Sequence, residues 1–283
     1  MALQRIFHYT SVESLAMILS TRKLRFSRLD GVDDMREAQT HAGVNFGKYF
    51  FVSCWTQQAE ENIPQWSMYS HEMRGVRIEL ADYPFHDVPL RPKTKWPGIQ
   101  WSEDLLSPIP FENLWGPTYF IAPMFLKKEH FAGAVDYVDD IQVVYDKSIR
   151  REIQSNGTVN LKIDSLPLLP RKKSSEWSFQ KEYRFSLFAM PSLPVPPEGP
   201  GSKAFSQTIG QFMSNSLVNN IDPGISHIDV TMAPGAFDKA VIRLGPLASP
   251  GTRVCVESLL AQFAPQARLE RSALEGAVRA RLR

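Results

Sequence analysis

Two short stretches, around residues 8 and 182, carry the side chains best suited to chemistry. His8 and Tyr9 end an apolar stretch that precedes a helical pattern over residues 12–19. An imidazole in that place can hold a ribose hydroxyl or move a proton, and a phenol ring can stack on a planar heterocycle. The structural alternative is a core histidine satisfied by a backbone carbonyl, beside a packed tyrosine. We treat His8 as a candidate catalytic residue and Tyr9 as a candidate ligand-binding residue.

The second stretch, residues 177–188, alternates apolar and polar side chains, which predicts a strand. The alternation places Gln180, Glu182 and Arg184 on one face and Tyr183 on the other. A carboxylate beside an amide suits stabilisation of a cationic, sugar-centred transition state, so Glu182 is the second candidate catalytic residue. An ion-pair ladder between Glu182 and Arg184 is the structural alternative.

Three aromatic residues, Trp55, Trp66 and Tyr69, can wall a pocket for a flat ligand, although such spacing is also typical of core packing. Familiar catalytic motifs are absent: the sequence has no Gly-rich phosphate loop, no His-Glu-x-x-His site, no Gly-x-Ser-x-Gly elbow and no Cys-x-x-Cys pair. Neither His41 nor His71 has the spacing of a metal ligand, so we predict no metal site.

The chemistry-bearing residues need a scaffold, and the chain is long enough to build one. The 283 residues are 43% hydrophobic and 22% charged, as in an ordinary globular protein. No apolar run of membrane-spanning length and no secretory signal is found, which predicts a cytoplasmic protein that does not enter a membrane. The net charge of +2 indicates no strong general attraction to nucleic acid or anionic membrane.

Period-two and helical patterns alternate along the chain and predict one α+β domain over residues 1–264, with a mixed, mainly antiparallel sheet flanked by helices. Residues 84–117 are rich in proline and tryptophan and lack a sustained period, so we expect an irregular insertion there. We expect a strand at 141–145 and a helix at 148–154. Residues 265–283 predict a basic helical tail.

Several motifs together resemble the bacterial domain-of-unknown-function 2971 family. The turn Asp33-Asp34-Met35-Arg36-Glu37 departs from the family pattern at two positions, and Met68 stands where the family has histidine. The motifs that carry the resemblance are His8-Tyr9-Thr10-Ser11, Leu24-Arg25-Phe26-Ser27, Ser53-Cys54-Trp55-Thr56, Trp66-Ser67-Met68-Tyr69, Gly75-Val76-Arg77-Ile78-Glu79 and the stretch from Trp177 to Arg184.

A leading His, aromatic residues in mid-chain and a late Gln-x-Glu also resemble the ADP-ribosyltransferase superfamily. That resemblance implies an ADP-ribosyltransferase-like fold and NAD as the cosubstrate. It implies that His8 binds a ribose, that Tyr9 or Tyr69 stacks on nicotinamide, and that Glu182, with Gln180 beside it, stabilises the oxocarbenium-like state. Arg25 would meet the pyrophosphate, because a guanidinium fork matches phosphate oxygens.

The leading hypothesis is therefore an NAD-using glycosyl-transfer enzyme that ADP-ribosylates a macromolecule or hydrolyses NAD, as a toxin or phage-defence effector would. The first alternative is a non-catalytic module that binds a nucleotide or a protein partner through the same aromatic residues, Trp66 included. The second is a nucleic-acid-processing enzyme, since Lys172, Lys173 and the arginines of the tail could contact phosphates.

Overall fold

A computed structural model describes residues 4–92, 104–153, 155, 159–192 and 202–279. These residues form a ten-stranded sheet in the order β10-β15-β5-β1-β6-β17-β18, with β2, β9 and β16 attached beside this path. Its strands are β1 (Arg5–Thr10), β2 (Lys23–Arg28), β5 (Phe50–Thr56), β6 (Val76–Ala81), β9 (Tyr119–Ala122), β10 (Ala132–Ala134), β15 (Glu182–Pro191), β16 (His227–Thr231), β17 (Val241–Leu244) and β18 (Arg268–Glu270). Every pairing within this sheet is antiparallel except that of β17 with β18. The predicted α+β class, with a mixed, mainly antiparallel sheet, is confirmed.

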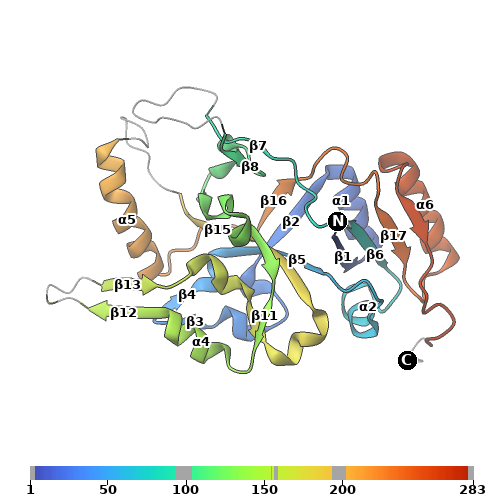
Figure 1. Ribbon diagram of the computed structural model, residues 1–283, viewed down its shortest axis with the longest axis horizontal. Helices are drawn as coiled ribbons and strands as arrows, with labels where there is room; N and C mark the ends of the chain where they lie inside the picture. Colours follow the sequence, from blue (N-terminus) through green and yellow to red (C-terminus); the bar gives the residue numbers. More distant parts are fainter. Residues whose placement is uncertain (1–3, 93–103, 154, 156–158, 193–201, 280–283) are drawn as a thin grey trace.

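Short strand pairs and helices complete the described part of the chain (Figure 1). The pairs are β3 (Thr40–His41) with β4 (Val44–Asn45), β7 (Val88–Pro89) with β8 (Leu106–Ser107), β11 (Asp136–Val138) with β14 (Lys172–Ser174), and β12 (Ile149–Ile153) with β13 (Val159–Ile163). The α-helices are α1 (Val12–Thr21), α2 (Ile63–Tyr69), α3 (Lys128–Phe131), α4 (Ile141–Ser148), α5 (Lys203–Val218) and α6 (Pro250–Phe263). The 3-10 helices are Leu29–Gly31, Met35–Ala38, Phe46–Lys48, Phe111–Leu114, Pro123–Leu126, Leu166–Arg171 and Ser175–Gln180.

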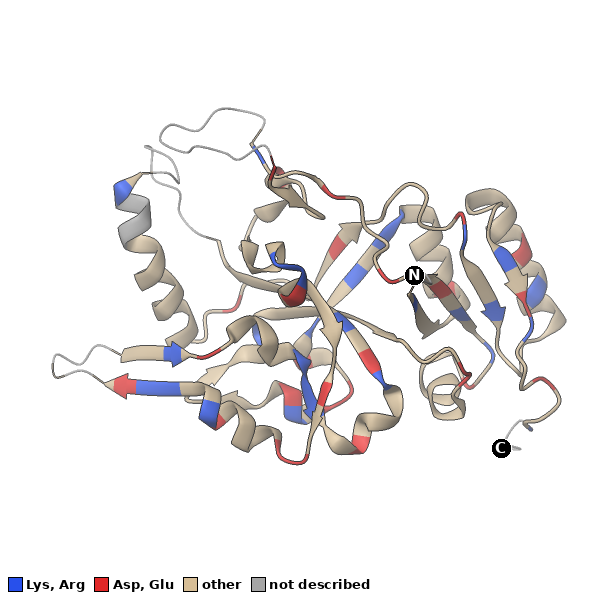
Figure 2. Ribbon diagram, in the orientation of Figure 1, with Lys and Arg blue, Asp and Glu red and all other residues tan. Residues whose placement is uncertain are grey.

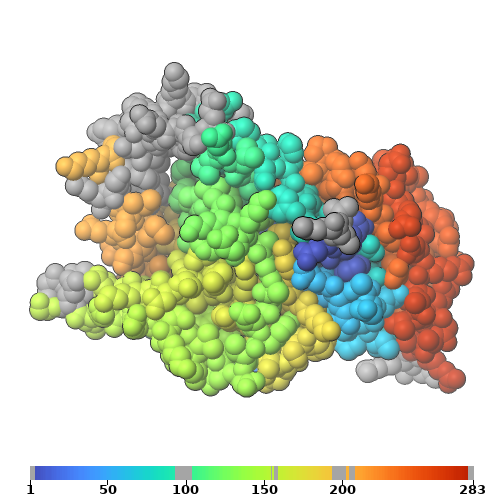
Figure 3. All heavy atoms as spheres, in the orientation of Figure 1, coloured from blue at the N-terminus to red at the C-terminus, as the bar shows by residue number. Residues whose placement is uncertain are grey.

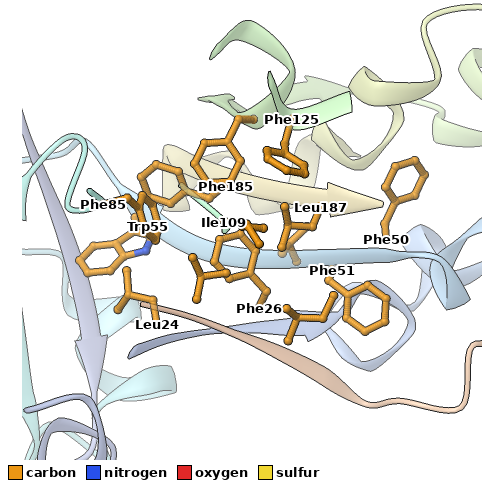
Figure 4. Close-up of a cluster of buried hydrophobic side chains, with 14 of the residues drawn as sticks. Leu24, Phe26, Phe50, Phe51, Trp55, Phe85, Ile109, Phe125, Phe185 and Leu187 are labelled. Carbon is orange, nitrogen blue, oxygen red and sulfur yellow. The ribbon is translucent and has the colours of Figure 1, made fainter. Parts of the chain in front are cut away.

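The centre of the sheet is the pair β5 and β15, whose register runs from Glu182 opposite Thr56 to Phe188 opposite Phe50. Both strands are buried on both faces for most of their length, which fits their aromatic and β-branched composition. Figure 4 shows Phe185 of β15 among the aromatic side chains that fill the core on one side of these strands, with its ring centroid 5.0 Å from that of Phe85. The core therefore fixes the two strands that carry Glu182 and its neighbours.

The edge of β5 that faces away from β15 is shared by two different strands. β2 pairs there through Ser27 with Val52, and β1 pairs through Phe7 with Thr56. Among the described residues no strand pairs on this edge with Ser53–Trp55 of β5, which lie between those two contacts. We call this opening, bounded by residues 7–9 of β1, 24–27 of β2 and 53–55 of β5, the sheet fork.

Helix α1 connects β1 to β2 and closes one side of the sheet fork. Ser11 caps it by accepting a hydrogen bond from the Ser14 backbone N–H at 3.1 Å, and Leu15 and Leu19 are fully buried. α1 and α6 lie at the end of the molecule that carries β17, and α5 lies at the opposite end (Figure 1). On the face shown in Figure 3, N-terminal residues in blue lie beside later residues in light blue, and C-terminal residues in red lie at the same end of the molecule. None of the helices in the described ranges combines the length and the apolar character needed to cross a bilayer.

Three segments differ from the sequence-based expectations. Residues 141–148 form α4 and residues 149–153 form β12, the reverse of the expected order, because the Asp140 carboxylate accepts from the Val143 N–H at 3.1 Å and caps a helix. In the expected helical tail, residues 268–270 form β18, which pairs with β17, and residues 280–283 lie outside the described part.

The 84–117 segment contributes to the core as well as to the surface. Residues 93–103 lie outside the described part, including two of its tryptophans, Trp96 and Trp101. In the flanking residues the regular structure is limited to β7, β8 and one 3-10 helix, as an irregular insertion predicts. Five of its buried side chains belong to the main hydrophobic core: Phe85, Leu90, Ile109, Phe111 and Leu114. Apolar contacts with the sheet therefore anchor the insertion on both sides of the undescribed residues.

Candidate functional site

A cavity of about 630 Å³ opens at the sheet fork, a volume in the range of small-molecule sites. Its walls come from β1, α1, β2, β5, α2, β14 and β16, from residues 31–33, and from the chain on either side of the start of β15. The sequence nominated eight residues, and seven of them line the cavity: His8, Tyr9, Arg25, Trp55, Tyr69, Gln180 and Glu182. The fold thus brings together side chains that lie more than 170 positions apart, from His8 to Glu182.

His8 occupies the gap that the fork leaves in the sheet. Its Nδ1 lies 2.9 Å from the backbone carbonyl oxygen of Cys54, and a carbonyl can only accept, so Nδ1 carries the hydrogen. Burial lowers the pKa of His8 more than this hydrogen bond raises it, which favours the neutral ring. Neutral His8 with its hydrogen on Nδ1 has a lone pair on Nε2, and Nε2 can accept a hydrogen bond from a hydroxyl group.

Tyr9 is a wall of the cavity whose hydroxyl group is already engaged. The hydroxyl oxygen accepts from the Asn62 backbone N–H at 3.1 Å and from Arg77 Nη1 at 3.5 Å. The ring meets the ring of Trp66 edge to face, with centroids 4.8 Å apart. Tyr9 is only 4% exposed, so most of its side chain packs inside the protein. A ligand could contact only the part of Tyr9 that lines the cavity.

Trp66 does not line the cavity, in contrast to the expectation that it binds the ligand. It is fully buried, and its Nε1 donates to Glu61 Oε2 at 2.9 Å. Trp55 lines the cavity instead; its ring lies 5.1 Å from the His8 ring and its Nε1 donates to Ser53 Oγ at 3.1 Å. Helical spacing could not separate Trp66 from Tyr69, because both belong to α2, where Trp66 is buried in the core and Tyr69 lines the cavity.

Glu182 belongs to a group of five charged side chains, which we call the buried charge cluster: Asp33, Glu37, Lys173, Glu182 and Arg184. Arg184 Nε donates to Glu182 Oε1 at 2.6 Å, and the same guanidinium group also pairs with Glu37. Lys173 Nζ donates to Glu182 Oε2 at 3.1 Å and to Asp33 Oδ1 at 3.0 Å. The ion pair between Glu182 and Arg184 that was the structural alternative is therefore present, and the cavity is lined by every member of the cluster except Glu37.

The charges in the cluster shift one another's pKa values in opposite directions. Burial alone would raise the pKa of Glu182, but the charges of Arg184 and Lys173 outweigh it, and the pKa falls below its ordinary value. Burial has the larger effect on Glu37, whose pKa is raised. The carboxylates also hold the pKa of Lys173 above its ordinary value despite its burial. Glu182 is therefore ionised at neutral pH, held between two cations.

Asp33, Tyr69 and Gln180 form a hydrogen-bonded set in the wall of the cavity, next to Lys173. The Tyr69 hydroxyl donates to Asp33 Oδ2, and Gln180 Nε2 donates to the same oxygen at 3.2 Å. Burial and the Asp33 charge raise the pKa of Tyr69, so the phenol keeps its proton and remains a donor. Gln180 reaches this place from the 3-10 helix Ser175–Gln180 rather than from a strand, and Lys181, with φ of 42°, turns the chain into β15.

Arg25 lines the cavity at its exposed side, where it already has an anionic partner. Its guanidinium group binds both carboxylate oxygens of Asp229 on β16, at 3.0 and 3.2 Å. The Arg25 side chain is 56% exposed, so this ion pair is screened by solvent and contributes little to stability. A pyrophosphate at Arg25 would have to replace Asp229 or share the guanidinium with it.

Asp33 and Lys173 belong to the site but were not nominated as catalytic or ligand-binding residues of this cavity from the sequence. Asp33 looked like a turn residue, and Lys173 looked like a surface contact for nucleic acid. Lys173 is 2% exposed, and its ammonium group lies 4.9 Å from the ring centroid of Trp177, so it does not offer a charge to a polyanion at the surface. Within the described ranges no group of three or more His, Cys, Asp or Glu side chains is arranged to hold a metal ion.

No family model, curated protein or solved structure matches this chain. Function is therefore inferred from the chemistry of the cavity.

Proposed function

We propose that this protein binds NAD in the sheet-fork cavity and breaks the bond between nicotinamide and ribose. The ADP-ribosyl group then passes to a macromolecule or to water. We also propose that the forked sheet is of the ADP-ribosyltransferase-like type and that the chain is related to the domain-of-unknown-function 2971 family, on the motifs quoted above. An effector of bacterial defence or a toxin would use such a reaction.

The observation that carries the proposal is that a neutral histidine and a buried carboxylate face one cavity across one intervening strand. Phe7, Thr56 and Glu182 form a row across β1, β5 and β15. Because neighbouring strands lie about 4.8 Å apart, the backbones of Phe7 and Glu182 are separated by roughly 10 Å, which brings His8, the next residue of β1, and Glu182 to one cavity. That separation allows both side chains to reach one dinucleotide from two sides.

The proposed step breaks the glycosidic C–N bond, and nicotinamide leaves with the bonding electron pair. The ribosyl cation that develops is attacked by water or by a nucleophile of the acceptor, which gives up its proton. His8 Nε2 accepts a hydrogen bond from a ribose hydroxyl, while Trp55 and Tyr69 present their rings to the nicotinamide. Glu182 and Asp33 are the carboxylates that face the developing positive charge.

The second candidate function is non-catalytic binding of a nucleotide. Arg184 and Lys173 favour this function, because their positive charges compensate most of the negative charge of Glu182. That negative charge is what would stabilise a ribosyl cation. In that case the cavity selects a ligand by shape and hydrogen bonding, and nothing is turned over. The same residues bind in both cases, so the two functions differ in product formation alone.

One experiment on the wild-type protein tests both functions. Isothermal titration with NAD measures binding, and nicotinamide release followed by chromatography measures cleavage, each with ADP-ribose as a product standard. Binding with release supports the enzyme, and binding without release, with or without added macromolecular acceptor, supports the binding module. If neither NAD nor ADP-ribose binds, the NAD-cleaving enzyme and a module that binds NAD are both wrong.

A further inference from the structure

We propose that a second cavity, on the other side of Phe7, binds a phosphate group. This cavity measures about 410 Å³ and is lined by Phe7, Gln57, Ala59, Glu79 and three arginines, Arg5, Arg77 and Arg243. The described chain supplies three guanidinium groups and one carboxylate to its lining. The proposal concerns a different site from the NAD cavity and does not depend on the proposed function.

The three arginines come from three adjacent strands, which places their side chains together. Across β1, β6 and β17, Tyr9 lies opposite Arg77, and Arg77 lies opposite Arg243. Side chains of directly paired residues point to the same face of a sheet, and like charges opposite one another destabilise the pair. β17 lies beside β6 at the α6 end of the molecule, and Figure 2 shows basic and acidic residues interspersed along that end. An anion between Arg77 and Arg243 converts their repulsion into two attractive contacts.

Arg77 is the decisive residue, because it is a buried cation that lacks a carboxylate. It is 2% exposed, and within the described ranges no acidic side chain forms an ion pair with it. Its Nη1 donates to the Ala59 carbonyl oxygen at 2.8 Å, whereas its Nε has no hydrogen-bond partner in that part of the chain. A buried charge without a counter-charge is strongly unfavourable, so a missing anion is the simplest completion of this site.

Aromatic rings give Arg77 a part of the compensation that it needs. Its guanidinium carbon lies 4.6 Å from the ring centroid of Phe7 and 5.8 Å from that of Tyr9. These contacts hold the guanidinium group in place but leave its net charge intact. A planar fork fixed in this way matches two oxygens of a phosphate better than a flexible cation does.

The other two arginines complete the site and limit its charge. Arg5 Nε donates to Glu79 Oε1 at 3.0 Å, and Arg243 pairs with Glu270 at 2.6 Å and with Glu61 at 3.3 Å. Nε of Arg243 is nevertheless buried without a hydrogen-bond partner among the described residues. A cavity of this size is larger than a lone phosphate ion, and it has room for a phosphate monoester with a small organic group.

The test measures ligand-induced stabilisation of the full-length wild-type protein. Inorganic phosphate and a sugar phosphate monoester are titrated against acetate and chloride at constant ionic strength and pH, with thermal unfolding and phosphorus NMR line width as readouts. We expect saturable stabilisation by one or both phosphate probes only, and the tighter of the two identifies the source. Equal stabilisation by acetate, or no stabilisation by either phosphate probe, overturns the proposal.

Variants locate the site within the protein. Arg77→Met keeps much of the side-chain length without the charge and should weaken phosphate binding at least about tenfold, because charged hydrogen bonds are lost. If Arg77→Met does not fold, Arg243→Gln, which is partly exposed, should give a smaller loss in the same direction. Arg253→Gln removes an exposed α6 arginine paired with Glu257 and serves as the matched control. Wild-type affinity in both Arg77→Met and Arg243→Gln, or a loss in Arg25→Gln instead, overturns the assignment.

Discussion

His8 fills the fork in the sheet by donating from Nδ1 to the Cys54 carbonyl oxygen at 2.9 Å, a bond that a neighbouring strand would otherwise supply. The donor nitrogen is therefore structural and the other nitrogen, Nε2, is available to a ligand. Asparagine can place its amide N–H near the Nδ1 position but has nothing at the Nε2 position. Glutamine reaches the Nε2 position and gives up the donor at Nδ1.

The two substitutions should thus separate the roles of His8. We expect the free energy of unfolding of His8→Asn to lie within about 1 kcal/mol of the wild-type value. Its affinity for NAD should be at least tenfold lower, because a hydrogen bond to the ligand is lost. His8→Gln should lose stability and keep more of the affinity. Chemical denaturation and titration calorimetry measure the two effects, and the opposite pattern would show that Nδ1 faces the ligand.

Glu182 and Glu37 form a matched pair of carboxylates, since both bind Arg184 but the cavity is lined by Glu182 alone. Glu182→Gln should lower the rate of nicotinamide release by about 10² or more if the carboxylate stabilises a ribosyl cation. Glu37→Gln should lower the free energy of unfolding by about 1–3 kcal/mol, about as much as Glu182→Gln does, yet retain most of the turnover. Equal turnover by wild type and Glu182→Gln would contradict a catalytic role for Glu182.

Trp55 and Trp66 report on whether the ligand enters the sheet-fork cavity. NAD binding should change tryptophan fluorescence, and Trp55→Phe should remove most of that change, because the Trp55 ring is at the cavity wall. Trp66→Phe should leave the change in place, since Trp66 is fully buried and bonded to Glu61. A signal that disappears with Trp66 and persists without Trp55 would place the ligand elsewhere.

His41 should make the free energy of unfolding depend on pH. It is 1% exposed and stacks on Tyr145 with ring centroids 4.2 Å apart, and neither ring nitrogen has a hydrogen-bond partner in the described chain. Burial lowers the pKa of His41 below its ordinary 6.5, although Asp146, with Oδ1 3.9 Å from Nδ1, opposes this shift. The unfolded chain therefore binds the proton more readily, and stability that is complete above pH 6.5 is lost as the pH falls through the folded pKa.

His41→Phe keeps the stacked ring and removes the titrating group. We expect its stability to be equal to wild type or higher at pH 7.5, and its decline between about pH 6.5 and 5 to be shallower by up to about 1.4 kcal/mol per pH unit. Urea denaturation at a series of pH values gives this slope. His8, whose pKa is also lowered by burial, contributes to the slope that remains.

The sequence was a good guide to which stretches converge and a poor guide to what each polar group touches. The helical pattern over residues 12–19 located α1, and the alternation within residues 177–188 located the first part of β15, because burial of one face or both is a local property of the sequence. The reversal at 141–153 came from β-branched residues, Ile141 and two valines, which favour a strand until Asp140 caps a helix. The strand β18 needed the edge of β17, which no local pattern reveals.

In the candidate site, too, local patterns could be predicted from the sequence and contacts between distant segments could not. Alternation along residues 182–184 correctly put Glu182 and Arg184 on one face, yet Asp33 and Lys173 joined them from segments whose local sequence indicates a turn and a basic loop. Trp66 was nominated with Trp55 because both are aromatic and regularly spaced, and their different surroundings are set by tertiary packing. Pairing between distant charged residues is therefore the part of this site that the sequence alone does not encode in any readable pattern.

The buried charge cluster also bears on how the protein is made. Lys173 meets Asp33 across 140 positions, and Arg184 meets Glu37 across 147. Contacts of such long sequence separation require large loops to close before they contribute any stability. During synthesis, the cavity lacks the wall that Glu182 and Arg184 form until β15 has left the ribosome. A fragment that ends before Lys173 carries His8 and Asp33 without Lys173 and Arg184, so the cavity is complete only after that part of the chain has been translated.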